Sequence, residues 1–121
     1  MSSKHAKLLF IFIFSSFLMS GCSSDSKNYI TTGDSLLNAG KYSQAITYYS
    51  NAINNDTNNA EAYTKRGYAY YKLKNYSNAL DSLDKAINSD PKYINADLYE
   101  AYTLSNENRY SDAITMLNTA L

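Results

Sequence analysis

A short phrase that occurs three times, at a spacing of 34 residues, constrains the fold of this chain more than any other feature. The copies begin at Tyr42, Tyr76 and Tyr110, and each continues with Ser, a variable residue, Ala, and then Ile or Leu. A second Ala lies seven residues beyond the first in every copy. A fixed period between about 20 and 50 residues is typical of repeat proteins, in which each copy is one unit that packs on its neighbours.

The residues within each copy favour a pair of antiparallel helices. In the second copy apolar residues recur at helical spacing and form one stripe, which comprises Ala79, Leu80, Leu83, Ala86 and Ile87. Polar residues such as Lys74 and Asn75 precede this stripe and suit a turn. Pro91 follows it and cannot continue a helix. The small residues Gly67 and Ala79 would let the two helices approach closely.

A frame of 34 residues divides the chain into repeats at 26–59, 60–93 and 94–121, of which the last is incomplete. Equivalent positions then align, as for Gly33, Gly67 and Ala101. On these residues the chain resembles tetratricopeptide repeat (TPR) proteins over about 96 residues. The resemblance implies an all-α fold, a right-handed α-solenoid of antiparallel helix pairs with about three TPR units. The third repeat departs from the pattern, with Asp97 where an aromatic residue is expected and Tyr99 two places later, so its first helix is expected to be rotated or looser.

The first 21 residues are typical of a secretory signal peptide. A basic start is followed by twelve uncharged residues, too few to span a bilayer. The sequence Met19-Ser20-Gly21-Cys22 then resembles the lipobox of bacterial lipoproteins. The resemblance implies removal of residues 1–21 and acylation of Cys22, with palmitate among the lipids, and we expect residues 22–27 to be a short linker. The alternative is a plain secreted protein with a free thiol.

This segment predicts where the protein resides. A lipid-anchored protein would lie in the bacterial cell envelope on the extracytoplasmic side of its membrane. In lipoproteins of double-membrane bacteria an Asp after the acylated Cys usually signals retention in the inner membrane, and here that position is Ser23. An outer-membrane protein that faces the periplasm is therefore expected if the source has two membranes.

The residue inventory argues against catalysis, cofactors and nucleic acid. Beyond the signal peptide the chain has no His, and its one Cys would carry lipid, which removes the usual general base, nucleophile and zinc ligands. No run of Lys or Arg is present to neutralise phosphates. Asp81 and Asp84 could share one helix face and bind a cation, but a solvated face is the simpler interpretation. We therefore predict no catalytic residue, no metal site and no cofactor.

The family resemblance also predicts a binding surface, because the first helix of each TPR lines the concave side. Carried onto this chain, it gives the candidate contact residues Ile30, Leu37, Asn38, Tyr68, Tyr71, Lys72, Leu98 and Tyr102. Tyr residues are common in interface hot spots, although these three could also be merely exposed. Ile30 and Asp34 replace the Lys and Asn with which some family members grip a C-terminal carboxylate, so that specificity is not expected.

The remaining tyrosines divide by position. Those at the aromatic or large apolar positions of the repeat are expected in the core, namely Tyr29, Tyr42, Tyr49, Tyr63, Tyr70, Tyr76 and Tyr110.

No polar capping helix follows the third repeat, so Ile114, Leu117 and Leu121 should be exposed. A partner or a second copy would cover them, or the chain is a fragment of a longer protein.

Two functions follow from these observations. The first is a membrane-anchored extracytoplasmic scaffold that binds a peptide or protein segment in the concave groove. The alternative is an accessory subunit of an envelope, pilus-assembly or cell-wall enzyme complex, which would make its contact through the uncapped C-terminal face. That face could also join two copies as a homo-oligomer.

Overall fold

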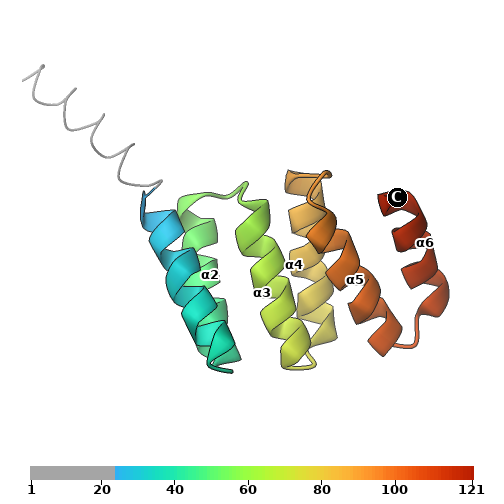
Figure 1. The fold of residues 1–121 in the computed structure, drawn as a ribbon, viewed down its shortest axis with the longest axis horizontal. Helices are drawn as coiled ribbons and strands as arrows, with labels where there is room; N and C mark the ends of the chain where they lie inside the picture. The colour runs from blue at the N-terminus through green and yellow to red at the C-terminus, as the bar shows by residue number, and fades with distance from the viewer. Residues whose placement is uncertain (1–23) are drawn as a thin grey trace, which may run out of the picture.

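The computed structural model describes residues 24–121, and the helices in this part form one row (Figure 1). Residues 24–38 form the first described helix. The helices that follow are α2 (Tyr42–Asn55), α3 (Ala60–Lys72), α4 (Tyr76–Ser89), α5 (Ile94–Asn106) and α6 (Tyr110–Ala120). No strand occurs among the described residues, so the predicted all-α solenoid is confirmed.

The predicted signal peptide and Cys22 lie outside the described residues. Residues 24–27, which were expected to belong to a linker, are helical instead. The hydroxyl of Ser26 is buried there and donates to the carbonyl of Ala52 at 3.2 Å, which holds the start of the helix against α2. Within 24–121 no helix is long and apolar enough to cross a membrane.

The turn inside each repeat has the same backbone geometry, with one residue in the left-handed region. The three residues are Gly40, Lys74 and Asn108, and they have φ values of 74°, 60° and 62°. The next residue then donates its amide to a carbonyl five residues back, as Asn75 does to Tyr70 at 3.0 Å. This pattern satisfies carbonyls that a helix end would leave unpaired. The repeat period therefore fixes the turns as well as the helices.

The helix pairs approach closely where the sequence places glycine. A Cβ atom on Gly33 would lie 2.6 Å from the ring of Tyr49, and one on Gly67 would lie 2.7 Å from Leu83. Both of these neighbours are fully buried. The predicted close approach at Gly67 is confirmed, and the same contact recurs one repeat earlier.

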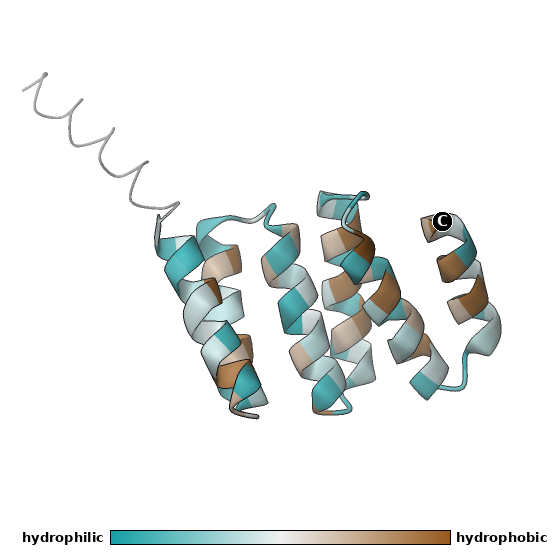
Figure 2. Cartoon of the chain, viewed as in Figure 1, coloured by the Kyte–Doolittle hydropathy of each residue, from teal (hydrophilic) through white to brown (hydrophobic). Residues whose placement is uncertain are grey.

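Packing weakens along α6, where Ala113 is the only buried residue among those described in that helix. Tyr110 was expected in the core but is 58% exposed, so that prediction is wrong. The expected exposure of Ile114, Leu117 and Leu121 is confirmed, and apolar segments are visible along α6 in Figure 2. No described helix covers the outer side of α6, which is why its Tyr finds no core to enter.

Candidate protein-binding groove

A groove of about 290 Å³ crosses three helices on the side where the first helix of each repeat lies. Leu37 and Asn38 line it from the helix at 24–38, Tyr68 lines it from α3, and Tyr99 lines it from α5. Its charged lining residues are Asp34 and Lys65. The structure thus brings together three of the predicted contact residues, Leu37, Asn38 and Tyr68.

The charged groups of the groove are held by one another. Lys65 Nζ lies 2.5 Å from Asp34 Oδ2 and 3.1 Å from Glu61 Oε1. The other oxygen of Asp34 accepts a hydrogen bond of 2.7 Å from the hydroxyl of Tyr49. Burial opposes the charge on Lys65, but its hydrogen bonds to Asp34 and Glu61 outweigh burial and raise its pKa. Burial, together with the bond to Asp34, raises the pKa of the Tyr49 hydroxyl. Asp34 is therefore fixed in place by two partners.

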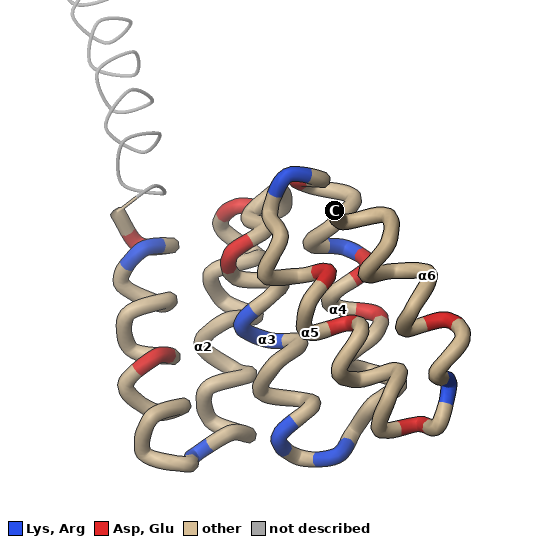
Figure 3. Tube along the Cα trace, turned by 45° about the vertical axis from the view of Figure 1, so that its right-hand side comes forward, with Lys and Arg blue, Asp and Glu red and all other residues tan. Residues whose placement is uncertain are grey.

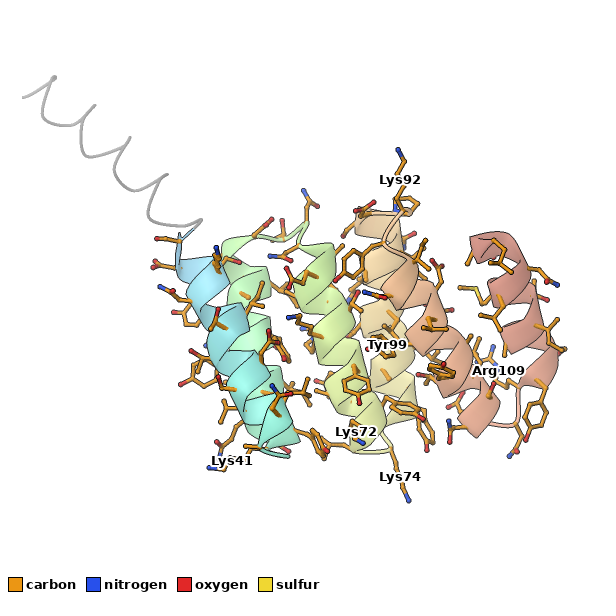
Figure 4. All side chains as sticks on the ribbon, viewed as in Figure 1. Lys41, Lys72, Lys74, Lys92, Tyr99 and Arg109 are labelled. Carbon is orange, nitrogen blue, oxygen red and sulfur yellow. The ribbon has the colours of Figure 1, made fainter. Side chains whose placement is uncertain are left out.

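Aromatic rings continue from the groove toward the turn after α3. The ring centroids of Tyr68 and Tyr99 are 4.8 Å apart, those of Tyr68 and Tyr71 are 6.2 Å apart, and those of Tyr71 and Tyr76 are 6.0 Å apart. The side chain of Asn106 donates to the hydroxyl of Tyr71 at 3.1 Å, which ties α5 to this series. Figure 4 shows Tyr99 between α3 and α5.

Two groove residues, Lys65 and Tyr99, were missed in the sequence. Tyr99 had been noted only as a departure from the repeat pattern, two positions beyond the expected aromatic residue. Its ring partly enters the core around Leu83 and Ala96, and it also meets Tyr68. Lys65 carried no signal of its own, because only the fold places it opposite Asp34.

The other predicted contact residues lie elsewhere. Ile30 is 8% exposed and packs with Ala52, Ile53 and Ala62, so its side chain is part of the core and not of the groove lining. Lys72 lies 5.8 Å from the ring centroid of Tyr42, near the turn end of the repeat. Leu98 and Tyr102 are exposed on α5 but do not line the groove.

Apart from Tyr110, the tyrosines that were predicted to lie in the core are buried or partly buried. Tyr49 is fully buried, and Tyr29 and Tyr63 pack against the cluster that contains Ile30. Tyr42, Tyr70 and Tyr76 are half-buried.

The acidic residues of α4 do not belong to a larger cluster of metal-ligating side chains among residues 24–121. Asp81 pairs with Lys85 at 3.0 Å on the exposed side of the helix. In the part of the chain that the structure describes, no group of three or more His, Cys, Asp or Glu side chains could hold a metal ion.

Comparison with known proteins identifies the repeat. A tetratricopeptide repeat family model matches residues 30–94, more than half of the chain. The chain belongs to the tetratricopeptide repeat family. No curated protein matches its sequence.

Solved TPR structures share the fold at low sequence identity. The TPR domain of Arabidopsis OM64 is 24% identical with a TM-score of 0.80, and the match covers 83% of each chain. The second TPR of Spaghetti (RPAP3), bound to the HSP90 peptide SRMEEVD, is 23% identical with a TM-score of 0.80, over 85% of this chain and 94% of that one. The TPR2B domain of yeast Sti1, in a pHsp70 complex, is 23% identical with a TM-score of 0.79, over 80% of this chain and 78% of that one.

Proposed function

We propose that this TPR protein is a lipid-anchored, extracytoplasmic scaffold that binds an extended segment of a partner protein in its concave groove. The observation that carries the proposal is the groove itself, which crosses three helices and presents both aromatic and charged groups. One of the similar solved structures, the second TPR of Spaghetti, holds a peptide, as its description states. A non-enzymatic role fits a chain whose described residues include neither His nor Cys.

The composition of the groove favours an apolar or aromatic segment over an acidic tail. Lys65 is compensated by Asp34 and Glu61, so no positive charge is left to attract a carboxylate. Tyr68 and Tyr99 offer ring faces, and Leu37 adds an aliphatic side chain. Aromatic and aliphatic side chains of a partner would gain from burial against these groups. We infer that the groove differs in specificity from one that binds a peptide ending in acidic residues.

The sequence around Cys22 supports the lipid anchor. Only Ser23 separates this Cys from the first described helical residue. At about 3.3 Å for each extended residue, an acylated Cys22 would hold the first helix within roughly 10 Å of the bilayer. We place the protein in the bacterial cell envelope, on the outer membrane facing the periplasm if the source has two membranes.

A photo-crosslinking experiment tests the groove. The photoreactive amino acid p-benzoylphenylalanine is placed at Tyr68 in one variant and at Leu117 in another, and adducts formed in the native cell are compared by mass spectrometry. We expect one defined adduct from position 68 that disappears when Leu37 is changed to Ala. Adducts only from position 117, or adducts from position 68 that persist in the Leu37→Ala variant, would contradict binding in the groove.

A second candidate function rests on α6. Ile114, Leu117 and Leu121 expose apolar surface there, and apolar helix faces of this kind are typical of interfaces. In this case the protein would be an accessory subunit of an envelope, pilus-assembly or cell-wall enzyme complex, or would pair with a second copy of itself. Crosslinking from position 117 is the outcome that favours this alternative.

The anchor is tested by replacing Cys22 with Ser. The wild-type protein should incorporate labelled palmitate and sediment with membranes, and the Cys22→Ser variant should do neither. A variant that still incorporates palmitate would show that Cys22 is not the lipidated residue.

A further inference from the structure

A second hollow of about 280 Å³ lies between α4, α5 and α6, and it shares no lining residue with the groove. Its apolar lining comes from Leu80, Leu104 and Met116. Asp84 and Glu100 add two carboxylates, and Arg109 and Asp112, which form an ion pair, also line the hollow. Acidic positions on α4 and α5 come close together in Figure 3. The hollow thus combines an apolar lining with an excess of negative charge.

Glu100 is the exceptional group in this hollow. Its side chain belongs to a residue only 8% exposed, and its Oε2 atom is buried without a hydrogen-bond partner among residues 24–121. Buried polar atoms almost always have a partner, because burial without one costs free energy. Glu100 lines the hollow, and a carboxyl group there with one unpartnered oxygen points to a ligand that would complete its interactions.

Comparison with the preceding repeat shows which hydrogen-bond partners Glu100 lacks. Arg66 occupies the position of Glu100 one repeat earlier, and it donates to Ser50 at 3.3 Å and to Ser82 at 3.1 Å. In the third repeat the equivalents of these two serines are Asp84 and Met116. Neither an ionised carboxylate nor a thioether can donate a hydrogen bond. The positions that satisfy a cation in the second repeat surround a carboxyl group with an unpartnered oxygen in the third.

Arg109, the cation that lines the hollow, already forms ion pairs with other carboxylates. Arg109 contacts Asp112 at 2.8 Å and Glu107 at 3.6 Å, and Figure 4 shows it between α5 and α6. Burial and the charges of Asp84 and Asp97 raise the pKa of Glu100 from 4.5 to about 7, against the opposing effect of Arg109. Burial and the neighbouring Asp81 also raise the pKa of Asp84. Both carboxylates would gain from an external cation.

We propose that this hollow binds an alkylammonium group, the chemistry of a lysine side chain or of a small primary amine. The ammonium would lie between Glu100 and Asp84, and the alkyl stem would lie against Leu80, Leu104 and Met116. An ammonium has three donors and a compact charge, and its alkyl stem gains from apolar contact. An inorganic cation would leave that apolar lining unused. This site is separate from the groove and does not depend on the function proposed for it.

A methyl-detected NMR titration of the full chain in detergent tests the site at pH 8. The probe is n-butylammonium, and n-butanol serves as the control that keeps the stem without the charge. We expect saturable shifts of the Leu80, Leu104 and Met116 methyl signals with the amine. Binding should weaken at least tenfold in Glu100→Gln and also at pH 5.5, because protonated Glu100 loses its charge. Asp81→Asn removes a nearby charge that does not line the hollow and should bind as the wild type does.

A blocked tripeptide with a central lysine, and its Nε-acetyl derivative, distinguish the two sources of the group. Binding of the lysine peptide but not of the acetylated one supports a protein partner. Binding of butylammonium alone supports a free amine. Equal binding of n-butanol, no saturable shift, or unchanged affinity in Glu100→Gln would overturn the proposal. If Glu100→Gln does not fold, Asp84→Asn provides the same comparison.

Discussion

The same position in two successive repeats holds opposite charges, with opposite consequences. In the second repeat Arg66 reaches the hydroxyls of Ser50 and Ser82 and is satisfied. In the third repeat Glu100 lines a hollow with Asp84 and Met116 and keeps an unpartnered oxygen. Because the helices around both positions follow one repeat pattern, the difference comes from the side chains. The difference at these three positions separates a hydrogen-bonded arginine from a carboxyl group with an unpartnered oxygen.

Substituting arginine, the residue of the second repeat, at the equivalent position of the third repeat should produce the largest change in the free energy of unfolding. Glu100→Arg removes the buried carboxylate and puts a guanidinium beside Asp84 and Asp97. We expect the free energy of unfolding at pH 8 to rise by about 2 to 3 kcal/mol, since each unit of pKa shift corresponds to about 1.4 kcal/mol. Urea unfolding measures this change. A loss of stability would show that the hollow cannot accept a cation.

Neutralising the carboxylate without adding a charge should have a smaller effect in the same direction. Glu100→Gln keeps the shape of the side chain but leaves an amide that is incompletely hydrogen-bonded. We expect a gain of about 1 to 2 kcal/mol at pH 8. A variant less stable than the wild type would show that the ionised Glu100 has a partner after all.

The gain from Glu100→Gln should depend on pH. The pKa of Glu100 is raised on folding, so its unfavourable contribution is absent below pH 4.5, grows as pH rises, and is complete above about pH 7. Burial is the largest cause of this rise in pKa, and among the charged groups that face Glu100, Asp84 and Asp97 add to it and Arg109 opposes it. Unfolding curves of the two proteins should therefore converge near pH 4.5 and separate toward pH 8. A constant difference across this range would exclude titration of Glu100 as the cause.

Disturbing the satisfied position should lower stability. Arg66→Met keeps an unbranched stem but removes the donors to Ser50 and Ser82 and the contact of Arg66 with the ring of Tyr63, which lies at 5.4 Å. We expect a loss of about 1 kcal/mol, the usual net value of such hydrogen bonds. Thermal melts of the two proteins at matched pH give the comparison. An unchanged melting temperature would mean that Arg66 contributes nothing in this position.

An exposed carboxylate of α4 provides the smallest effect. Asp81 pairs with Lys85 on the surface of the helix, and such pairs contribute about 0.3 to 0.5 kcal/mol. Asp81→Asn should therefore change stability by less than about 0.5 kcal/mol. A larger change in urea unfolding would show that even an exposed acidic residue on this helix affects stability. The effects of substituting Glu100 could then not be assigned to its position opposite that of Arg66.

The helical repeat could be predicted well from the sequence because equivalent positions in each 34-residue unit make equivalent packing contacts. The two helices of the second repeat approach closely at Gly67 as expected, and the turns at Gly40, Lys74 and Asn108 follow the same spacing. Prediction failed where a residue depends on its neighbours in space. Tyr110 is exposed because no described helix covers the outer side of α6, and Ile30 is buried because it packs with Ala52 and Ile53.

The binding surfaces were only partly predictable for the same reason. Tyr68 and Leu37 follow from the family frame, but Lys65 enters the groove through its pairing with Asp34, which the sequence does not show. The alignment of Glu100 with Arg66 is visible in the sequence. Its consequence appears only when the fold places Asp84 and Met116 around the same hollow.

The pKa of Glu100 tests this account most directly. The side-chain carboxyl carbon of Glu100 can be followed by NMR from pH 3 to pH 9 in the wild-type protein, with Glu100→Gln used to assign the signal. The account predicts a midpoint at about pH 7, since the carboxylate is buried near Asp84 and Asp97. Addition of n-butylammonium should lower that midpoint. A midpoint near 4.5 that the amine does not move would contradict the claim that Glu100 is an uncompensated carboxylate awaiting a cation.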